Sequence, residues 1–476
     1  MVLLLCAPTV IGSHAQTFTT LVKFNGTNGA NPRAGLVQAT DGSFWGTTTS
    51  GGTPLTNCGG GCGTIFKITR AGVLTTLHTF TGPDGSGPAG ALIQATNGSF
   101  YGTTGSGGAN GYGTVFKITP SGTLTTVHSF DSTDGANPQA ALIQAANGSL
   151  YGTTPYGGAN GDGGTIFRIT GGTLTTLHNF AGPGLDGNTP DGLTQASNGS
   201  LYGTTYGGTS NPCCGTVFKI TPAGTLTTLY SFTGGIDGYN PYGGLVQGTN
   251  GSFYGATAYG GIPGDPALCQ SGCGTIFKIT PGGMLTTLYS LCAEINCTDG
   301  AYPFSGLIQA TDRNLYGTTL GGGVTGSSYT YGTVFKITPS GALTVLHSFD
   351  ATDGASPYAA LLQATDGTFY GTTYFGGLDL CSGFNGCGTV FSLSVGLGPF
   401  VKTLPTSGKV GASIKILGTN LTDATSVTFN GTSVAFTVVS PSLITTNVPT
   451  GATTGTVRVV TPPDSLTSNV AFLVRP

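Results

Sequence analysis

The chain has 476 residues, a net charge of −3 and only 7% charged residues, and it contains no basic run of the kind that attracts nucleic acid. After the first residues no stretch is apolar enough to span a membrane, so we expect no transmembrane segment in the mature chain. Gly is abundant, with 85 residues, while Thr, Val, Phe and Tyr recur at regular spacing. This composition favours strands joined by tight turns and predicts an all-β protein.

The N-terminus resembles a secretion signal. Residues 2–12 form an apolar run, and the segment Ser13-His14-Ala15 follows with a small residue at each end, as a signal peptidase requires. The basic segment that normally opens such a leader is missing, which is consistent with a start inside a longer leader. We predict a signal peptide over residues 1–15 and a secreted or cell-surface protein; the alternative is an unstructured N-terminus.

A repeated motif governs most of the chain. The pattern G-T-[VI]-F-[KR]-I-T occurs six times, at Gly63, Gly113, Gly164, Gly215, Gly274 and Gly332, and a seventh, degenerate copy begins at Gly388. The central Phe residues of successive copies are 50 to 59 residues apart. That period suits a four-stranded blade, so the sequence predicts a seven-bladed β-propeller.

The strands of a blade can be placed from one clear copy, where turn sequences such as Asn97-Gly98 separate the apolar segments. The expected strands are 91–96, 99–106, 113–119 and 123–130. The seventh copy has only three such segments, 359–365, 368–374 and 388–394. Residues 17–24 read as a lone fourth strand before the first copy. We predict that 17–24 pairs with 388–394 and closes the ring, which removes exposed sheet edges.

The repeat text L-[IV]-Q-A-T-[DN]-G-[ST]-[FL]-Y-G-T-T, followed by G-T-[VI]-F-K-I-T-P-x-G-x-L-T-T-L-H-S-F, resembles the GloVer tandem repeat of exported bacterial proteins. The resemblance covers residues 17–394. It implies a bacterial origin and export, in a family whose members often have a surface anchor, and it implies no known activity.

The composition changes after a linker that we place at 395–402. The text Ile414-Lys415-Ile416-Leu417-Gly418, followed by Val427-Thr428-Phe429, resembles an IPT/TIG immunoglobulin-like domain. The apolar alternation at Val427/Phe429 and at Val457/Val459 fits a β-sandwich. We therefore expect a small immunoglobulin-like β-sandwich over residues 403–476. In exported proteins such domains act as spacers or binding modules.

Ten cysteines follow the leader in five close pairs: Cys58/Cys62, Cys213/Cys214, Cys269/Cys273, Cys292/Cys297 and Cys381/Cys387. Even numbers at short spacing in loops favour local disulfides and an oxidising compartment. Zinc is the alternative, but it needs about four converging ligands. Because each pair is expected in a different repeat with no nearby His, we favour disulfides and expect no metal. Whether the adjacent Cys213 and Cys214 bond to each other stays open, since such a ring is strained.

Residues that recur in every blade are interpreted as architecture, because catalysis needs its residues once. One position of the fourth strand holds His78, His128, His178, Tyr230, Tyr289 and His347. These side chains lie on different blades, so they cannot converge on a metal or a catalytic triad. The innermost strands hold Gln38, Gln94, Gln144, Gln195, Gln247, Gln309 and Gln363. We expect these amides to satisfy backbone groups between blades, with a carbohydrate-binding ring as the alternative.

Two further recurring sets have structural interpretations. The aromatic residues Trp45, Tyr101, Tyr151, Tyr202, Tyr254, Tyr316 and Tyr370 are expected to pack between blades. The loops between blades hold Asn28, Asp84, Asp134, Asp186, Asp237, Asp299 and Asp353, each before Gly. Short Asp and Asn side chains stabilise such turns. Calcium is the alternative, although one carboxylate in each loop is too few for a site, and we expect no cofactor.

The long, variable loops and the cysteine pairs emerge on one face of the propeller, where binding sites usually lie. Tyr156, Tyr206, Tyr259 and Phe375 flank these loops and are the candidate ligand-binding residues, able to stack on a sugar or a partner's side chain. Packing within the turns is the alternative. The acids outside the repeat pattern are Asp162, Asp191, Asp265, Glu294 and Asp379. No two have a spacing that indicates a catalytic pair, so no catalytic residue is assigned.

Three functions remain open. We favour an exported binding or adhesion module that takes a polysaccharide or a protein partner on its disulfide-bearing loop face. The alternatives are an extracellular hydrolase or lyase acting on polysaccharide and a structural envelope protein. The sequence favours a protein that is not an enzyme, and it does not determine the oligomeric state.

Overall fold

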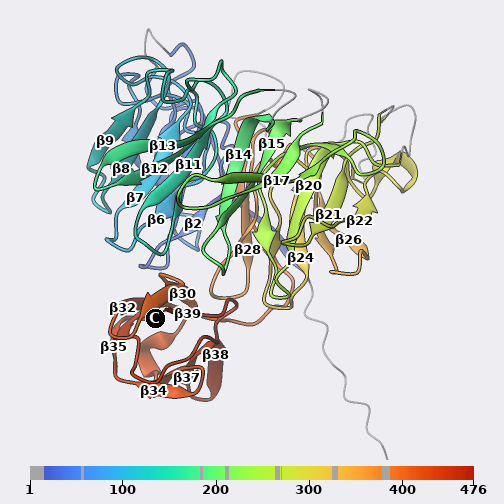
Figure 1. Cartoon of the computed structure of the whole chain (residues 1–476). Coiled ribbons are helices and arrows are strands. Elements are labelled where there is room, and N and C mark those ends of the chain that lie inside the picture. The colour runs from blue at the N-terminus through green and yellow to red at the C-terminus, as the bar shows by residue number, and fades with distance from the viewer. Residues whose placement is uncertain are drawn as a thin grey trace, which may run out of the picture.

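The computed structural model describes residues 16–54, 58–182, 186–208, 214–262, 269, 271–323, 331–377 and 386–475. The predicted all-β class is confirmed, because these residues form β-sheets with two short 3₁₀ segments, η1 (Ile295–Cys297) and η2 (Leu421–Asp423). Figure 1 shows a large group of sheets, coloured blue to orange, and a smaller orange-to-red group at one end of it. Within the described ranges no helix is long and apolar enough to cross a membrane. The predicted signal peptide, residues 1–15, lies outside them.

The large group contains seven antiparallel sheets of one design among the described residues. The first strands are β2 (Val37–Gln38), β6 (Ile93–Gln94), β10 (Ile143–Gln144), β14 (Asn188–Gln195), β19 (Val246–Gln247), β23 (Ile308–Gln309) and β27 (Leu362–Gln363), with β18 (Tyr239–Pro241) preceding β19. The second strands are β3 (Phe44–Thr48), β7 (Phe100–Thr104), β11 (Leu150–Thr154), β15 (Leu201–Gly207), β20 (Phe253–Tyr259), β24 (Leu315–Thr319) and β28 (Phe369–Thr373). The third strands are β4 (Thr64–Ile68), β8 (Thr114–Ile118), β12 (Thr165–Thr170), β16 (Thr216–Ile220), β21 (Thr275–Ile279), β25 (Thr333–Ile337) and β29 (Thr389–Ser394). The outer strands are β1 (Thr17–Lys23), β5 (Leu74–Thr79), β9 (Leu124–Ser129), β13 (Thr173–Asn179), β17 (Leu226–Ser231), β22 (Leu285–Ser290) and β26 (Leu343–Ser348).

Closure of the ring follows the prediction. Strand β1 pairs antiparallel with β29, with Phe18 opposite Leu393, so the first and last parts of the repeat share one sheet in the order β1-β29-β28-β27. The Phe24 ring is fully buried and meets the Phe66 ring edge-on, with 5.2 Å between centroids. The N-terminal strand therefore also packs on the next sheet along the chain.

The recurring glutamines connect neighbouring sheets, which confirms their expected role. Gln94 Oε1 accepts a hydrogen bond from the Thr40 backbone N–H at 2.9 Å, one sheet earlier in the chain. Equivalent bonds to Gln144, Gln195, Gln247, Gln309 and Gln363 continue around the ring. The Thr365 N–H donates to Gln38 Oε1 at 3.1 Å and joins the last sheet to the first. These amides thus satisfy backbone donors near the axis, where an unpaired polar group would be costly.

The recurring His and Asp residues bind each other. The distance from His78 Nε2 to Asp84 Oδ2 is 2.8 Å, and His128, His178 and His347 make the same contact with the Asp of their own loop. Where a blade has Tyr in place of His, the Tyr230 hydroxyl donates to Asp237 at 3.1 Å. Each pair ties an outer strand to the loop that follows it, which fits the structural interpretation of both sets.

The smaller group consists of short strands at the C-terminal end of the chain. They are β30 (Lys402–Leu404), β31 (Ser407–Lys409), β32 (Ser413–Leu417), β33 (Ser426–Phe429), β34 (Thr432–Val434), β35 (Phe436–Ser440), β36 (Leu443–Asn447), β37 (Val457–Thr461), β38 (Asp464–Thr467) and β39 (Leu473–Arg475). Two four-stranded sheets, β30-β32-β36-β35 and β34-β33-β37-β38, enclose a core that includes Ile416, Val427 and Val459. The expected alternation of Val427 with Phe429 and of Val457 with Val459 therefore points into this core.

The C-terminal sheets contact the turn end of the propeller. Ser442 Oγ donates to Thr40 O at 3.0 Å, Thr365 Oγ1 donates to Gly418 O at 3.1 Å, and Lys415 Nζ donates to Thr96 O at 3.2 Å. The propeller residue in each of these bonds lies two positions after the end of a first strand. The opposite end, where the long loops emerge, is left uncovered by this domain (Figure 1).

Three of the predicted disulfides are present: Cys58–Cys62, Cys269–Cys273 and Cys292–Cys297. Cys214 and Cys387 are also disulfide-bonded, and their predicted partners, Cys213 and Cys381, lie outside the described residues. The expectation that every pair lies apart from the others is wrong. Cys269/Cys273 lies just before β21 and Cys292/Cys297 lies just after β22. Because these two strands pair as a hairpin, both cysteine pairs lie at its open end, and their Sγ atoms all lie within 4.8 Å of one another.

Candidate ligand-binding site

Each sheet is joined to the next by a loop that ends in proline. The side chain of the residue after this proline lies near the central axis. The residue before the proline has a left-handed backbone, with φ of +57° at Asn31 and Asn137 and +60° at Tyr302. Its backbone N–H donates to the residue just before the Gly-Thr motif of the preceding sheet, as from Asn137 to Tyr112 O at 2.9 Å. The loop is thereby fixed to the sheet that it leaves.

The first glycine of the repeated motif receives the proline. Gly113 has a φ of +96°, and a Cβ there would collide with Thr104 O and lie 2.9 Å from Pro138 Cδ. The same contact recurs in all seven sheets, including that between Gly388 and Pro32 where the ring closes. Glycine suits this place because it accepts both the positive φ and the close approach of the ring.

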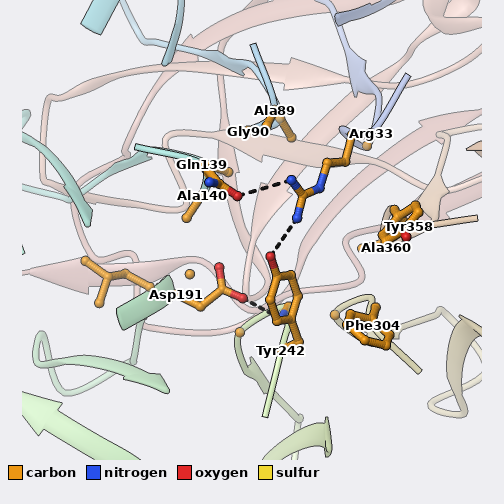
Figure 2. A pocket seen from close by; sticks show the side chains of 18 of the residues that line it. Arg33, Ala89, Gly90, Gln139, Ala140, Asp191, Tyr242, Phe304, Tyr358 and Ala360 are labelled. Carbon is orange, nitrogen blue, oxygen red and sulfur yellow. Dashed lines mark hydrogen bonds between the residues drawn. The ribbon is translucent and has the colours of Figure 1, made fainter. Parts of the chain in front are cut away.

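The residue after the proline is therefore presented at an equivalent place in every sheet, but its identity changes around the ring. The seven residues are Arg33, Ala89, Gln139, Asp191, Tyr242, Phe304 and Tyr358. All seven line one cavity of about 250 Å³. Figure 2 shows these side chains converging on a common space from different sheets.

Arg33 is the centre of a hydrogen-bond network in this cavity. Its Nη1 donates to Gln139 Oε1 at 3.1 Å, and its Nη2 donates to the Tyr242 hydroxyl at 2.6 Å (Figure 2). The guanidinium carbon also lies 5.6 Å from the centroid of the Tyr358 ring, a cation–π contact. A guanidinium has five N–H donors, and these two bonds use two of them.

Asp191 faces the same space. Its Oδ2 accepts a hydrogen bond from the Gly243 backbone N–H at 2.7 Å. The side chain keeps some exposure at the cavity wall, but the carboxyl lies deep between the sheets, and this burial raises the pKa of Asp191. Burial and the neighbouring Asp191 carboxylate raise the pKa of Tyr242 to about 12, so its hydroxyl stays protonated at neutral pH. The cavity thus combines a cation, an amide, a phenol and a carboxyl group.

Aromatic side chains predicted from the sequence lie beside this cavity. Tyr156 and Tyr206 line an adjoining cavity of about 330 Å³, which shares Asp191, Tyr242 and Phe304 with the axial one. The Tyr206 ring meets the Tyr242 ring edge-on, with 6.2 Å between centroids.

The other two predicted aromatic residues differ in position. Phe375 lines a third cavity, of about 430 Å³, which shares Arg33, Gln139 and Tyr358 with the axial one. Tyr259 is not among the residues on these walls; its ring packs edge-on against Phe304 at 5.8 Å. Three of the four candidates therefore border cavities that share wall residues, and the fourth, Tyr259, packs against Phe304, which lines two of them.

The acids outside the repeat pattern do not gather. Asp191 lines the axial cavity, Asp162 accepts a 2.5 Å hydrogen bond from the Gly157 N–H within its own loop, and the Glu294 side chain is exposed in the Cys292–Cys297 loop. Asp265 and Asp379 lie outside the described residues. The site therefore offers no pair of carboxyl groups among the residues that the structure describes.

Of the seven axial residues, only Asp191 is singled out from the sequence, and the other six are missed: Arg33, Ala89, Gln139, Tyr242, Phe304 and Tyr358. A signal for them exists in the repeat. The proline at this place is present in all seven copies, and the residue after it is the position that varies between charged, amide, aromatic and small side chains.

Seven similar antiparallel sheets arranged around one axial cavity define a β-propeller. In this chain the propeller is joined to an immunoglobulin-like domain. The family model of the Gloeobacter/Verrucomicrobia repeat matches residues 10–213, 55–266, 134–326 and 267–435, and the chain belongs to this family. The IPT/TIG domain matches residues 400–473. Both resemblances seen in the sequence are thereby confirmed.

Solved structures support the fold. An extracellular domain from B. thetaiotaomicron, described as part of a one-component system, has a TM-score of 0.51 at 12% identity, covering 97% of this chain and 58% of that one. A second structure of the same B. thetaiotaomicron protein's extracellular domain, described there as part of a hybrid two-component system, has a TM-score of 0.50 at 11% identity, covering 97% of this chain and 59% of that one. This chain thus spans less than two thirds of the solved chains. No curated protein sequence matches it.

Proposed function

We propose that the protein is an extracellular binding module that holds a saccharide chain in the axial cavity of its loop face. One observation carries the proposal: side chains of six different residue types converge on one cavity from a repeat position that follows the same proline in all seven copies. A position that serves only to pack the scaffold has equivalent surroundings in every blade, so the same residue is favoured there in each blade. A position that varies within such a scaffold is expected where an asymmetric ligand is bound.

The chemistry of the cavity suits a sugar. Arg33, Gln139 and the Tyr242 hydroxyl offer donors and acceptors within one network, and sugar hydroxyl groups need both. The flat faces of aromatic side chains such as Phe304 and Tyr358 can stack on the apolar faces of pyranose rings. Tyr156, Tyr206 and Phe375 extend this surface outward, which favours a chain of several sugar units over a single one.

An extracellular location is supported by two findings. Disulfides persist in oxidising compartments, and the chain has three in which both cysteines are described. The two solved structures described above, which share this fold, are both of an extracellular domain. These findings are independent of the axial cavity, so the location and the ligand can be tested separately.

A binding role is favoured over glycoside hydrolysis by the carboxyl content of the cavities. Glycosidases generally use two carboxyl groups, one on each side of the scissile bond. Among the described residues that line these three neighbouring cavities, Asp191 is the only acid. The described part of the cavity therefore has groups that can hold a sugar and a single carboxyl group, where cleavage generally uses two.

A glycan array tests the proposal. The wild-type chain should bind at least one glycan, and a double variant, Arg33→Ala with Tyr242→Ala, should lose at least 90% of that signal. Arg458→Ala is the matched control, because Arg458 is an exposed arginine on β37 in the C-terminal domain. Equal binding by the wild type and the double variant, or no binding to any glycan, would refute the proposed site.

A further inference from the structure

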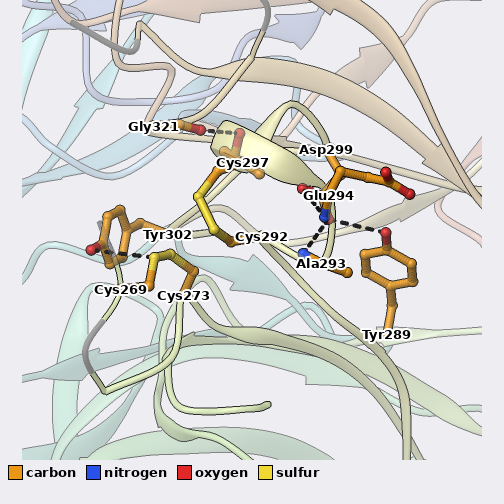
Figure 3. Close-up of a disulfide and its surroundings, with 11 residues drawn as sticks. Cys269, Cys273, Tyr289, Cys292, Ala293, Glu294, Cys297, Asp299, Tyr302 and Gly321 are labelled. Carbon is orange, nitrogen blue, oxygen red and sulfur yellow. Dashed lines mark hydrogen bonds between the residues drawn. A yellow bond between two sulfur atoms is a disulfide. The ribbon is translucent and has the colours of Figure 1, made fainter. Parts of the chain in front are cut away.

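Two disulfides of the chain lie against each other in the interior. Cys273 lies two residues before β21 and Cys292 lies two residues after β22, and the open end of this hairpin pairs Thr275 with Ser290. The hairpin thus brings Cys269–Cys273 and Cys292–Cys297 together, with all four Sγ atoms within 4.8 Å of one another. Each of the four residues is at most 1% exposed, and Figure 3 shows the two disulfides side by side.

We propose that in the reduced protein these four cysteines bind one zinc ion, so that the hairpin ends are held either by two disulfides or by a tetrathiolate site. Two equivalents of a dithiol reductant supply the four electrons and four protons that convert both disulfides to thiols, and the reductant becomes disulfide. Zinc then displaces four protons from the thiols and binds the four thiolates.

The spacing of the sulfur atoms suits a closed tetrahedral site. Zinc–thiolate bonds of about 2.3 Å place the four sulfurs of such a site about 3.8 Å apart. The sulfurs that lie farthest apart, at up to 4.8 Å, must approach by about an ångström to reach that arrangement. The two sulfurs of each disulfide must separate to the same distance once their bond is reduced. The two short loops, with spacings of four and five residues, resemble the paired loops of structural zinc sites.

The loops that carry the cysteines are also held by bonds that reduction does not break. The Cys292 N–H donates to Gly300 O at 3.0 Å, and the Gly272 N–H donates to Cys269 O at 3.2 Å. The Tyr302 N–H donates to Cys273 O at 2.8 Å and joins the two loops. These backbone bonds should keep the four thiols close once the disulfides are reduced.

The surroundings of the sulfurs favour thiolate as the ligand. The Tyr302 hydroxyl lies 3.7 Å from Cys269 Sγ and can donate to a thiolate there (Figure 3). The nearby Asp299 carboxylate already accepts hydrogen bonds from the Tyr289 hydroxyl at 3.0 Å and the Ala293 N–H at 2.9 Å. Because the Asp299 carboxylate is already hydrogen-bonded within its own loop, the four sulfurs are the expected zinc ligands.

The chain provides a matched control for this cluster. Cys58–Cys62 lies in the loop before β4, which is equivalent to the loop of Cys269–Cys273 before β21. At the position equivalent to Cys292, this earlier blade has Thr81 and no second cysteine pair. That loop thus has one cysteine pair and the β21–β22 hairpin has two. A disulfide alone explains the first pair, whereas only the second arrangement supplies four ligands.

The test compares three full-length chains: wild type, Cys58→Ser/Cys62→Ser and Cys292→Ser/Cys297→Ser. Each is reduced with excess dithiol, desalted without oxygen, mixed with zinc or cobalt(II) and passed over a desalting column. We expect about one zinc per chain by elemental analysis in the first two proteins, with the visible absorption of tetrahedral cobalt thiolate, and neither signal in the third.

Circular dichroism before and after reduction shows whether each variant is folded. Two results would overturn the proposal. One is a reduced wild-type chain that retains no more zinc than Cys292→Ser/Cys297→Ser. The other is a wild-type chain that unfolds on reduction and does not refold when zinc is added. Neither result depends on glycan binding, so the two proposals fail separately.

Discussion

Arg33 donates a hydrogen bond of 2.6 Å from Nη2 to the Tyr242 hydroxyl, although 209 positions separate the two residues in the chain. Arg33 precedes the first strand of the first full sheet, and Tyr242 lies between β18 and β19, so the bond connects distant sheets of the ring. Each side chain is placed by its own Gly–Pro contact, and their meeting defines the axial cavity.

Two substitutions at Tyr242 separate its hydroxyl from its ring. Tyr242→Phe removes the acceptor of the Arg33 hydrogen bond and should weaken glycan binding roughly 3- to 10-fold, about 0.5–1.5 kcal/mol. Tyr242→Ala also removes the stacking surface and should weaken binding more than Tyr242→Phe does. Titration calorimetry with the strongest array ligand measures both effects. Identical affinities for the two variants would contradict a stacking role for the ring.

Asp191 should make the stability of the fold depend on pH. Burial raises its folded pKa above the unfolded value of 3.8, so the folded state holds this proton more tightly than the unfolded chain does. The stabilising contribution is complete below pH 3.8 and is lost as the pH rises through the raised pKa.

The isosteric variant Asp191→Asn isolates this contribution, because an amide oxygen can still accept from the Gly243 N–H. Its melting temperature should exceed that of the wild type by a few degrees at pH 8 and match it near pH 4. A difference that stays constant across this range would show that the Asp191 carboxyl does not titrate as described.

Closure by the N-terminal strand can be tested by comparing two phenylalanines. Phe24 and Phe80 are both fully buried, and their rings meet Phe66 and Phe116 at 5.2 and 5.3 Å. If β1 is an integral part of the ring, Phe24→Ala and Phe80→Ala should each lower the free energy of unfolding by about 3–5 kcal/mol. Urea denaturation measures both. A loss below 1 kcal/mol for Phe24→Ala alone would argue against tight closure.

The Asp residues of the inter-blade loops should act without calcium. Asp84 accepts from the Thr81 N–H at 2.8 Å and the Thr81 hydroxyl at 2.9 Å, and it also contacts His78. We expect Asp84→Ala to cost about 1–2 kcal/mol of stability, equally with calcium and with a chelator. Calcium-dependent melting of the wild type, lost in Asp84→Ala, would support the cation instead.

The repeat made the architecture predictable because one packing solution recurs. The Phe spacing, the lone segment 17–24 and the innermost glutamines each follow from a blade that must pair with its neighbours. Strand bounds were less accurate. The first strand expected at 91–96 is only Ile93–Gln94, because its register with β7 extends over just two residue pairs.

The axial site was not predictable from the repeat pattern alone. The direction of Arg33 depends on the left-handed backbone at Asn31 and on the packing of Pro32 against Gly388, a residue from the far end of the chain. The cysteine cluster was missed for another reason. Cys273 precedes a predictable hairpin and Cys292 follows it, so both cysteines belong to one blade. The expectation of one cysteine pair in each repeat overlooks that the pairing of β21 with β22 brings the two pairs together.

Hydrogen–deuterium exchange of the full-length chain, with and without the strongest array glycan, tests the central claim most directly. Binding at the axial cavity predicts protection of the proline loops at residues 31–33, 137–139, 189–191 and 240–242, with unchanged exchange in the C-terminal strands β30 to β39. Protection confined to the C-terminal domain, or to the turns at its end of the propeller, would contradict a loop-face binding site.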